Sequence, residues 1–185
     1  MPPTPPALKL PVAPDWERLA ADHREKLARY AGRLLGDWDR GRDVAQEAWF
    51  RLMRQPAGKV PPGRELEWLY TVCRNRAIDL LRQRAKRVLS VDDLVAGAGA
   101  GAAVDSAHPG DGMERLEERS RLLELLGRLP ANQQEVVRLK FLEGFSYKEI
   151  ARITGLSAGN VGFLIHTAIG RLRRQLGAEK SKEIP

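Results

Sequence analysis

Apolar residues recur every three or four positions along most of the chain, which is the spacing of helices that bury one face. No segment shows the strict apolar–polar alternation of a half-buried strand. Asp15 has the residue type of a cap for the first helix, and Asp39 or Asp43 for the second. The pattern predicts an all-α chain with helices over 15–35, 44–54, 65–87, 111–128 and 130–143, and a helix-turn-helix from 146 onwards.

Segments rich in proline, glycine and alanine separate these helices into two groups. Six prolines make residues 1–14 a disordered arm, and Pro and Gly make 55–63 a loop. The Gly-Ala run within 88–112 predicts a flexible linker. We therefore expect two small helical domains joined by this linker, the second a four-helix domain with a helix-turn-helix. Their predicted bounds are 15–87 and 113–177, with a tail at 178–185.

The charge along the chain is positive and uneven. Lys and Arg number 31 against 24 Asp and Glu, a formal net charge of +7. Residues 1–90 carry 18 cations and 11 anions, 91–113 carry four Asp and no Lys or Arg, and 114–185 carry 13 cations and nine anions. Two basic blocks on either side of an acidic spacer favour two contacts with an anionic partner.

Cys73 is the single cysteine, which excludes an internal disulfide and a cysteine-rich zinc site. It lies in an apolar stripe and is expected to be a small buried residue. No apolar run approaches the ~18 residues of a membrane span, and the first residues lack the hydrophobic region of a signal peptide. The sequence therefore predicts a cytoplasmic protein without a membrane contact.

The segment 68–87 begins with aromatic residues and ends in dense positive charge. Trp68 and Tyr70 are candidates for stacking on exposed bases, and Asn75 for a hydrogen bond to a base edge. The predicted buried face consists of Leu69, Val72, Ile78 and Leu81, beside Cys73, Ala77 and Leu80. The cations that would hold phosphates are Arg74, Arg76, Arg82, Arg84, Lys86 and Arg87. The alternative is an ordinary amphipathic helix with snorkelling arginines and a surface amide.

A helix-turn-helix is predicted over 146–161 and the helix that follows. Ser146 and Glu149 form a capping box, and Ala151 is small where the two helices would cross. Gly155 can take the left-handed conformation of the tight turn, and Val161 would point back into the core. Such a unit places its second helix in the major groove of DNA. The candidate DNA contacts are Ser157, Asn160, Phe163, His166, Thr167, Arg171, Arg173 and Arg174.

A third candidate surface lies on the predicted second helix. Asp43, Gln46 and Glu47 are spaced at i, i+3 and i+4, so they share one face. An acidic, polar face on a basic chain is a poor place for nucleic acid and a reasonable contact for a protein. Phe50 is a candidate apolar anchor at its edge.

Both groups of helices together resemble the bacterial sigma factors of the extracytoplasmic-function type. The resemblance rests on Asp43 to Phe50, Trp68 to Arg82, and Leu129 to Leu156. It implies that Asp43, Gln46, Glu47 and Phe50 bind the coiled-coil clamp of core RNA polymerase. It further implies that the basic helix tracks the opened minus-ten element of promoter DNA, while the loop at 56–64 captures a flipped base.

The second helix of the helix-turn-helix departs from the family pattern. The family carries Lys, Ser-Arg and Arg where this chain has Gly162, Phe163-Leu164 and Thr167. Glycines within this helix also weaken it by roughly 1 kcal/mol each relative to alanine. Three outcomes are open for minus-thirty-five recognition. The recognised element is unusual in sequence, for example because thymine methyl groups are contacted. Alternatively, recognition is weak, or it depends on another protein that covers Phe163 and Leu164.

Two other functions compete with that of a sigma factor. One is a DNA-binding regulator without a polymerase role. This function does not explain the acidic face of Asp43, Gln46 and Glu47. The other is a sigma-like adaptor that binds polymerase or an anti-sigma factor but recognises no promoter. An enzyme is least favoured, because His23, His108 and His166 lie apart and no phosphate-binding glycine loop precedes a helix. No cofactor or metal is expected.

Overall fold

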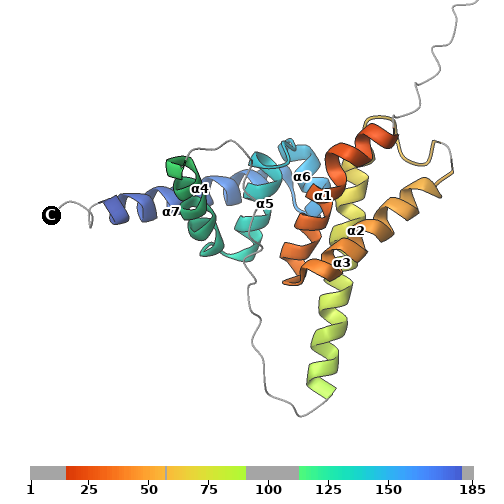
Figure 1. Cartoon of the computed structure of the whole chain (residues 1–185), viewed down its shortest axis with the longest axis horizontal. Helices are drawn as coiled ribbons and strands as arrows, with labels where there is room; N and C mark the ends of the chain where they lie inside the picture. Colours follow the sequence, from red (N-terminus) through yellow and green to blue (C-terminus); the bar gives the residue numbers. More distant parts are fainter. Residues whose placement is uncertain (1–15, 57, 91–112, 181–185) are drawn as a thin grey trace, which may run out of the picture.

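The computed structural model of the chain describes residues 16–56, 58–90 and 113–180. Over these residues it contains seven helices and no strand, and it confirms the all-α prediction (Figure 1). The first lobe consists of α1 (Trp16–Leu35), α2 (Trp38–Met53) and α3 (Glu65–Ser90). The second lobe has the four predicted helices: α4 (Met113–Gly127), α5 (Ala131–Phe141), α6 (Tyr147–Thr154) and α7 (Ala158–Lys180).

Several predicted features fall outside the described residues. They are the arm at 1–14, the cap at Asp15 and the linker from 91 to 112. The linker's predicted start is wrong, because α3 continues to Ser90. The predicted tail also starts too early, because α7 runs to Lys180. No helix in the described part of the chain is long and apolar enough to cross a membrane.

The second helix begins at Trp38, earlier than the sequence pattern predicts. Asp37 is its N-cap, and the Asp37 carboxylate accepts a hydrogen bond from the backbone N–H of Arg40 at 3.1 Å. Asp39 and Asp43 therefore lie inside the helix. Since Asp37 satisfies an orphan donor of the first turn, the helix can extend back to the α1–α2 turn, where Gly36 has a φ of 65°.

The helices α1 and α2 touch backbone to backbone. A Cβ atom added to Gly41 of α2 would lie 2.4 Å from the Cα of Gly32 in α1 and 2.8 Å from the carbonyl oxygen of Ala28. No side chain fits in that space. The crossing of the first two helices therefore depends on the glycine at position 41.

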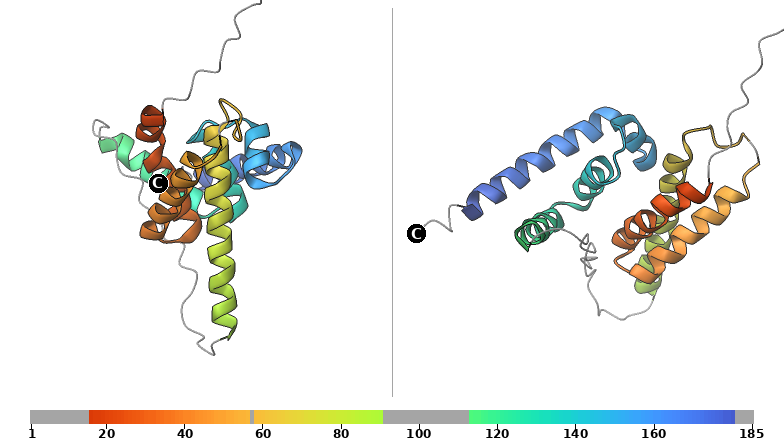
Figure 2. Two further views of the ribbon diagram at one scale, coloured as in Figure 1. Left: turned by 90° about the vertical axis from the view of Figure 1, so that its right-hand side faces the viewer. Right: turned by 45° about the horizontal axis from the view of Figure 1, so that its top comes forward.

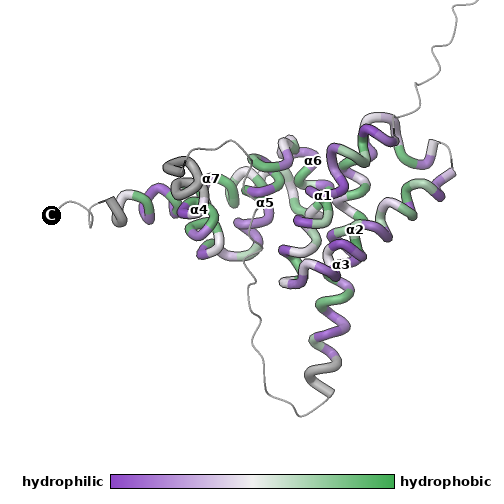
Figure 3. Tube along the Cα trace, viewed as in Figure 1, coloured by the Kyte–Doolittle hydropathy of each residue, from purple (hydrophilic) through white to green (hydrophobic). Residues whose placement is uncertain are grey.

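The helix α3 packs on the first two helices with its N-terminal half. Leu69, Tyr70, Cys73 and Ala77 are at most 1% exposed, whereas Leu81, predicted to be buried, is 38% exposed. The reason is visible in Figures 1 and 2, where the C-terminal part of α3 projects beyond the other described helices. Hydrophilic residues recur along this projecting part (Figure 3). The predicted buried stripe is therefore right only for its first half.

Cys73 is fully buried, as predicted for a small apolar residue. Its Sγ lies 3.8 Å from the carbonyl oxygen of Val44. Burial, together with the nearby carboxylate of Glu47, raises the pKa of the thiol to about 12. The residue contributes to packing between α2 and α3.

The second lobe confirms the predicted helix-turn-helix. The Ser146–Glu149 capping box is present, and Gly155 ends α6 with a φ of 74°. Ile150 and Val161 are fully buried and Ala151 packs against the same core. Pro130 precedes α5 as its N-cap rather than occupying the first turn, and α5 ends at Phe141, before the predicted Glu143.

The two lobes pack against each other and share one apolar core. The ring of Tyr70 in α3 lies 5.0 Å from that of Tyr30 in α1 and 4.9 Å from that of Phe145 before α6 (centroid distances). Helices α3 and α6 lie side by side at this junction (Figure 2). The structure is therefore a closed arrangement of the two lobes.

Candidate nucleic-acid interface

The predicted face of α2 exists as one shallow groove. Asp43, Gln46, Glu47 and Phe50 all line it. Arg51 and Arg54 complete the lining. Asp43 and Gln46 are exposed, and Phe50 is 49% exposed, so the aromatic ring is available at the edge of this face. The face is not net acidic as predicted, because Arg51 pairs with Glu47 and the charge of Arg54 offsets that of Asp43.

A second groove adjoins it between α1 and α2. Trp49, Phe50 and Met53 supply its apolar part, and Met53 is 62% exposed. The buried Nε1 of Trp49 has no hydrogen-bond partner among the described residues. Sequence reasoning missed Trp49 and Met53, although Met53 follows Phe50 by three residues and so shares its helix face.

The loop predicted to capture a base does lie beside Trp68. Val60, Pro61 and Arg64 of this segment line a depression together with Trp68 and Arg152. Trp68 is half-buried against the core. Arg152 comes from α6 of the second lobe, so the second lobe closes one side of the depression.

Tyr70 is not placed as predicted for a stacking residue. It is 1% exposed, and its hydroxyl donates a hydrogen bond to Glu143 of the second lobe at 2.6 Å. Burial and the neighbouring Glu143 carboxylate raise the tyrosine pKa far above its ordinary value. In the closed arrangement Tyr70 is a core residue at the junction of the lobes.

The predicted phosphate-binding cations divide into two sets. Arg74 donates to Glu135 of the second lobe at 2.8 and 3.3 Å, and Arg76 donates to Glu47 at 3.0 Å. Further along α3, the exposed members are Arg82, Arg84 and Lys86, and Asn75 is also exposed. The side chain of Arg87 lies outside the described part of the structure. Among the predicted phosphate-binding cations of α3 that the structure describes, the exposed ones lie on its projecting half, whereas Arg74 and Arg76 are paired with carboxylates.

Carboxylates hold the two lobes together at three points. Glu135 accepts from Arg74 and from the Tyr30 hydroxyl at 2.8 Å. Glu67 of α3 accepts two hydrogen bonds from Arg152 of α6, at 2.7 and 2.6 Å. Burial opposes ionisation of Glu67, but hydrogen bonds from Arg152 and Arg64 hold its pKa below the ordinary value. The third point is the Tyr70–Glu143 hydrogen bond.

The third contact predicts a pH dependence of lobe packing. Burial raises the pKa of Glu143, although Tyr70 and the α1 cations Lys26, Arg33 and Arg29 oppose the shift. The closed form therefore binds the Glu143 proton more tightly than an open form would, so packing weakens as pH rises through the raised pKa. The pKa of Glu67 is lowered, so its contribution to lobe packing has the opposite pH dependence. That contribution is lost only as the pH falls below the ordinary pKa of a glutamate.

We expect the radius of gyration, measured by small-angle X-ray scattering, to increase between pH 5 and pH 8. The variant Glu143→Gln should show a smaller increase in the radius of gyration with pH. Its amide oxygen can still accept a hydrogen bond from Tyr70, but the amide group does not titrate. Glu124→Gln, in an exposed pair with Arg128, is the matched control. If the radius of gyration of Glu143→Gln changes with pH as in the wild-type chain, Glu143 is not the group that controls lobe packing.

The second helix of the helix-turn-helix presents a mixed surface. Ser157 accepts a hydrogen bond from the backbone N–H of Asn160 at 3.1 Å and so caps α7. Phe163 is 66% exposed, whereas Leu164 is 8% exposed and belongs to the core. The alternative that another protein must cover Leu164 is therefore wrong, because its own lobe covers it.

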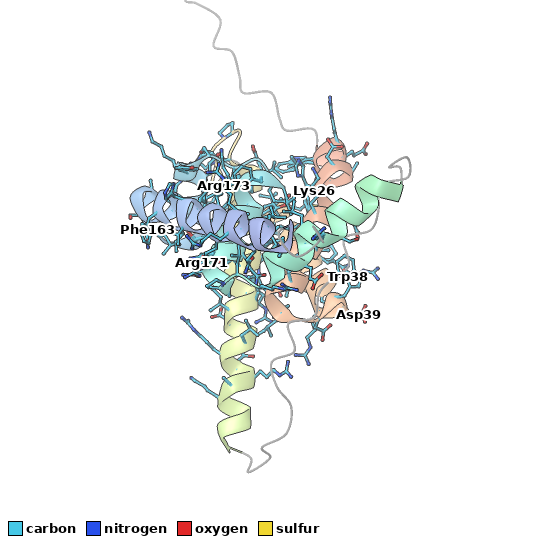
Figure 4. The ribbon with its side chains drawn as sticks, turned by 90° about the vertical axis from the view of Figure 1, so that its left-hand side faces the viewer. Lys26, Trp38, Asp39, Phe163, Arg171 and Arg173 are labelled. Atoms are coloured by element: carbon cyan, nitrogen blue, oxygen red, sulfur yellow. The ribbon has the colours of Figure 1, made fainter. Side chains whose placement is uncertain are left out.

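The remaining predicted contacts of α7 lie along one helix. Asn160 and His166 are exposed, and Thr167 is half-buried. Arg171 is half-buried and donates to Gln133 at 3.2 Å, while Arg173 and Arg174 are exposed. Figure 4 shows Phe163 near the beginning of α7 and Arg171 and Arg173 further along it. Among the described residues no cluster of His, Cys, Asp and Glu is suited to hold a metal ion.

Two family models match the chain, one in each lobe. Sigma-70 region 2 matches residues 19–87, and sigma-70 region 4 matches residues 119–172. The structure is similar to that of the sigma factor RpoE from Bartonella quintana, solved in complex with the anti-sigma factor NepR. The TM-score is 0.64 at 23% identity, over 88% of this chain and 97% of that one.

Curated relatives give the same result. SigL of Mycobacterium tuberculosis, an ECF RNA polymerase sigma factor, is 30% identical over 84% of this chain and 85% of its own. CarQ of Myxococcus xanthus, an RNA polymerase sigma factor, is 30% identical over 88% of this chain and 89% of its own. SigI of M. tuberculosis, a probable ECF sigma factor, is 31% identical over 85% of this chain.

The chain spans about half the length of SigI, 53% of that relative. SigL and CarQ, in contrast, are matched over most of their length. The family matches in both lobes and the identity to these relatives show that the chain belongs to the extracytoplasmic-function family of RNA polymerase sigma factors.

Proposed function

We propose that this protein binds core RNA polymerase and directs promoter recognition, promoter melting and transcription initiation, without being an enzyme itself. The observation that carries the proposal is the presence of three distinct surfaces on one chain. They are the polar, aromatic-edged groove of α2, the projecting cationic half of α3 and the helix-turn-helix. We further propose that it acts in the cytoplasm, where polymerase and promoter DNA would be encountered.

The groove of α2 is suited to a protein partner. Asp43 and Gln46 offer exposed acceptors, and the rings of Phe50 and Trp49 lie beside them. Aromatic anchors beside polar groups are typical of protein-binding hot spots. These features support the α2 groove as the polymerase contact.

The projecting half of α3 is suited to a single strand of DNA. Arg82, Arg84 and Lys86 would hold phosphates and release counterions. Trp68 and the 56–64 loop would receive an unstacked base, at a cost of a few kcal/mol per flipped base. Binding to the captured strand offsets that cost, so melting would need no ATP.

Promoter binding would require the lobes to separate. In the closed arrangement the Arg74 guanidinium is paired with Glu135, and Arg152 forms one side of the depression at Trp68. Under this proposal promoter DNA would need both the Arg74 guanidinium and the depression at Trp68. A partner that binds one lobe would shift the balance between closed and open forms, and the structurally similar sigma factor RpoE was solved in complex with an anti-sigma factor. We include an anti-sigma factor among the proposed partners.

The division of labour between α2 and α3 can be tested by two double variants. Arg82→Ala with Arg84→Ala should reduce open-complex formation, probed with permanganate, while binding to core polymerase persists. Two single-strand phosphate contacts contribute about 1.4 to the slope of log affinity against log salt, so the slope should fall by that amount. Gln46→Ala with Glu47→Ala should instead weaken binding to core polymerase.

Each double variant is the control for the other. Because Glu47 also pairs with Arg76, Asp43→Ala with Gln46→Ala provides a version that leaves this pair intact. If the α2 and α3 variants show the same defect, the division is wrong. If the wild-type chain neither binds core polymerase nor changes where it initiates, the proposed function is wrong.

A further inference from the structure

The first three turns of α7 hold an unusual set of side chains for a DNA-reading helix. Residues 157–169 contain no Lys or Arg. The N-terminal part of the second helix of a helix-turn-helix lies nearest the base edges. Arg and Lys are the usual bidentate readers of guanine, so this part of α7 cannot make that contact. Its exposed side chains include Asn160, Phe163 and His166.

Phe163 projects from α7 as an exposed aromatic ring. It is 66% exposed, and it is the large apolar side chain left exposed on the described part of α7. Protein-binding surfaces are contiguous apolar patches, whereas this ring is flanked by polar Asn160 and His166. The cationic end of the helix, with Arg173 and Arg174, also favours a polyanion over an apolar protein surface.

One neighbouring glycine, Gly159, leaves room for a close approach to the groove. Gly159 precedes Phe163 by four residues, so both lie on one face of α7. A Cβ atom at Gly159 would meet nothing within 4 Å. Because Gly159 has no side chain, the surface of α7 beside the Phe163 ring lies closer to the helix axis. The edge of one base can therefore approach the backbone of α7 while the ring of Phe163 contacts the adjacent base.

We propose that α7 reads adjacent A·T base pairs in the major groove, with Phe163 against a thymine 5-methyl group and Asn160 paired with an adenine. Apolar contact suits the thymine methyl group, and an asparagine amide matches N6 and N7 of adenine. Three helical residues rise about 4.5 Å. One base pair rises about 3.4 Å. The two side chains are therefore spaced to read neighbouring pairs. This inference rests on the proposed function.

The first experiment identifies the promoter bases that the second lobe reads. Core polymerase with the full chain would be used to select initiating templates from a library randomised upstream of a fixed start region. We expect A·T pairs at the positions that the second lobe contacts. In the selected promoter, each thymine of that element is then replaced by uracil, which removes only the 5-methyl group.

One uracil position should weaken binding about fourfold, which corresponds to ~0.8 kcal/mol for one buried methyl group. The variant Phe163→Ala should bind thymine and uracil templates equally. Phe141→Ala is the matched control, because Phe141 is 60% exposed but lies at the end of α5, and it should keep the fourfold ratio. Since the ratio compares two templates with one protein, a partly folded variant does not distort it.

Asn160 is tested in the same way with 7-deazaadenine, which lacks the N7 acceptor. The wild-type chain should discriminate against this base, and Asn160→Ala should not. If the wild-type chain initiates but ignores uracil at every position, or if Phe163→Ala keeps the discrimination, the proposal is overturned and the proposed function stands. If no template supports initiation, the proposed function itself fails.

Discussion

Replacing Glu135 with alanine is expected to separate the two lobes. The Glu135 carboxylate is 10% exposed and accepts hydrogen bonds from Arg74 and from the Tyr30 hydroxyl. Removing it leaves the Arg74 guanidinium, itself only 21% exposed, without its counter-charge. Breaking such a buried pair typically costs about 3 kcal/mol or more, enough to shift a closed equilibrium toward the open form.

The measurement is the radius of gyration of the full chain in solution, which should increase in Glu135→Ala. Glu124→Ala is the control, because its pair with Arg128 is exposed and surface pairs contribute about 0–1 kcal/mol. The double variant Arg74→Ala with Glu135→Ala should be more compact than Glu135→Ala alone, since no charge is left unpaired. A chain that stays closed in all three variants would show that the apolar contact alone holds the lobes.

The second large effect is expected from Gly41→Ala, which should destabilise the first lobe by about 3 kcal/mol, at the upper end of what overpacking typically costs. The added Cβ would lie 2.4 Å from the backbone of Gly32, where no flexible side chain can give way. All four tryptophans, Trp16, Trp38, Trp49 and Trp68, belong to this lobe. Urea unfolding followed by tryptophan fluorescence therefore reports on it directly.

Gly170→Ala provides the control for this substitution. Gly170 lies inside α7, and a Cβ there would meet nothing within 4 Å. Alanine should therefore stabilise α7, by up to about 1 kcal/mol, as measured by circular dichroism. An unchanged unfolding midpoint in Gly41→Ala would mean that α1 and α2 can move apart without loss of packing.

The features that the sequence predicts well are local ones. The capping box at Ser146 and the left-handed turn at Gly155 involve residues within a few positions of each other, and both are confirmed. The face of α2 is also a local pattern, and its members do line one groove. Its role as a polymerase contact stays a prediction.

The features that the sequence does not predict depend on distant residues. Tyr70 has the residue type of a stacking platform, but Phe145 and Glu143 of the other lobe cover it. Arg74 is one cation in a basic run, and only Glu135, 61 positions away, distinguishes it. The predicted start of α2 is wrong for another reason, because Asp37, Asp39 and Asp43 all have the residue type of a cap and only the fold selects Asp37.

The aromatic contact between the lobes has a thermodynamic consequence. When Tyr70 and Phe145 pack together, both rings leave water, and removal of apolar surface from water carries a negative heat-capacity change. Apolar association of this kind weakens on cooling. The enthalpy of lobe association should therefore vary with temperature, and chilled cells would hold a larger fraction of molecules with their lobes apart.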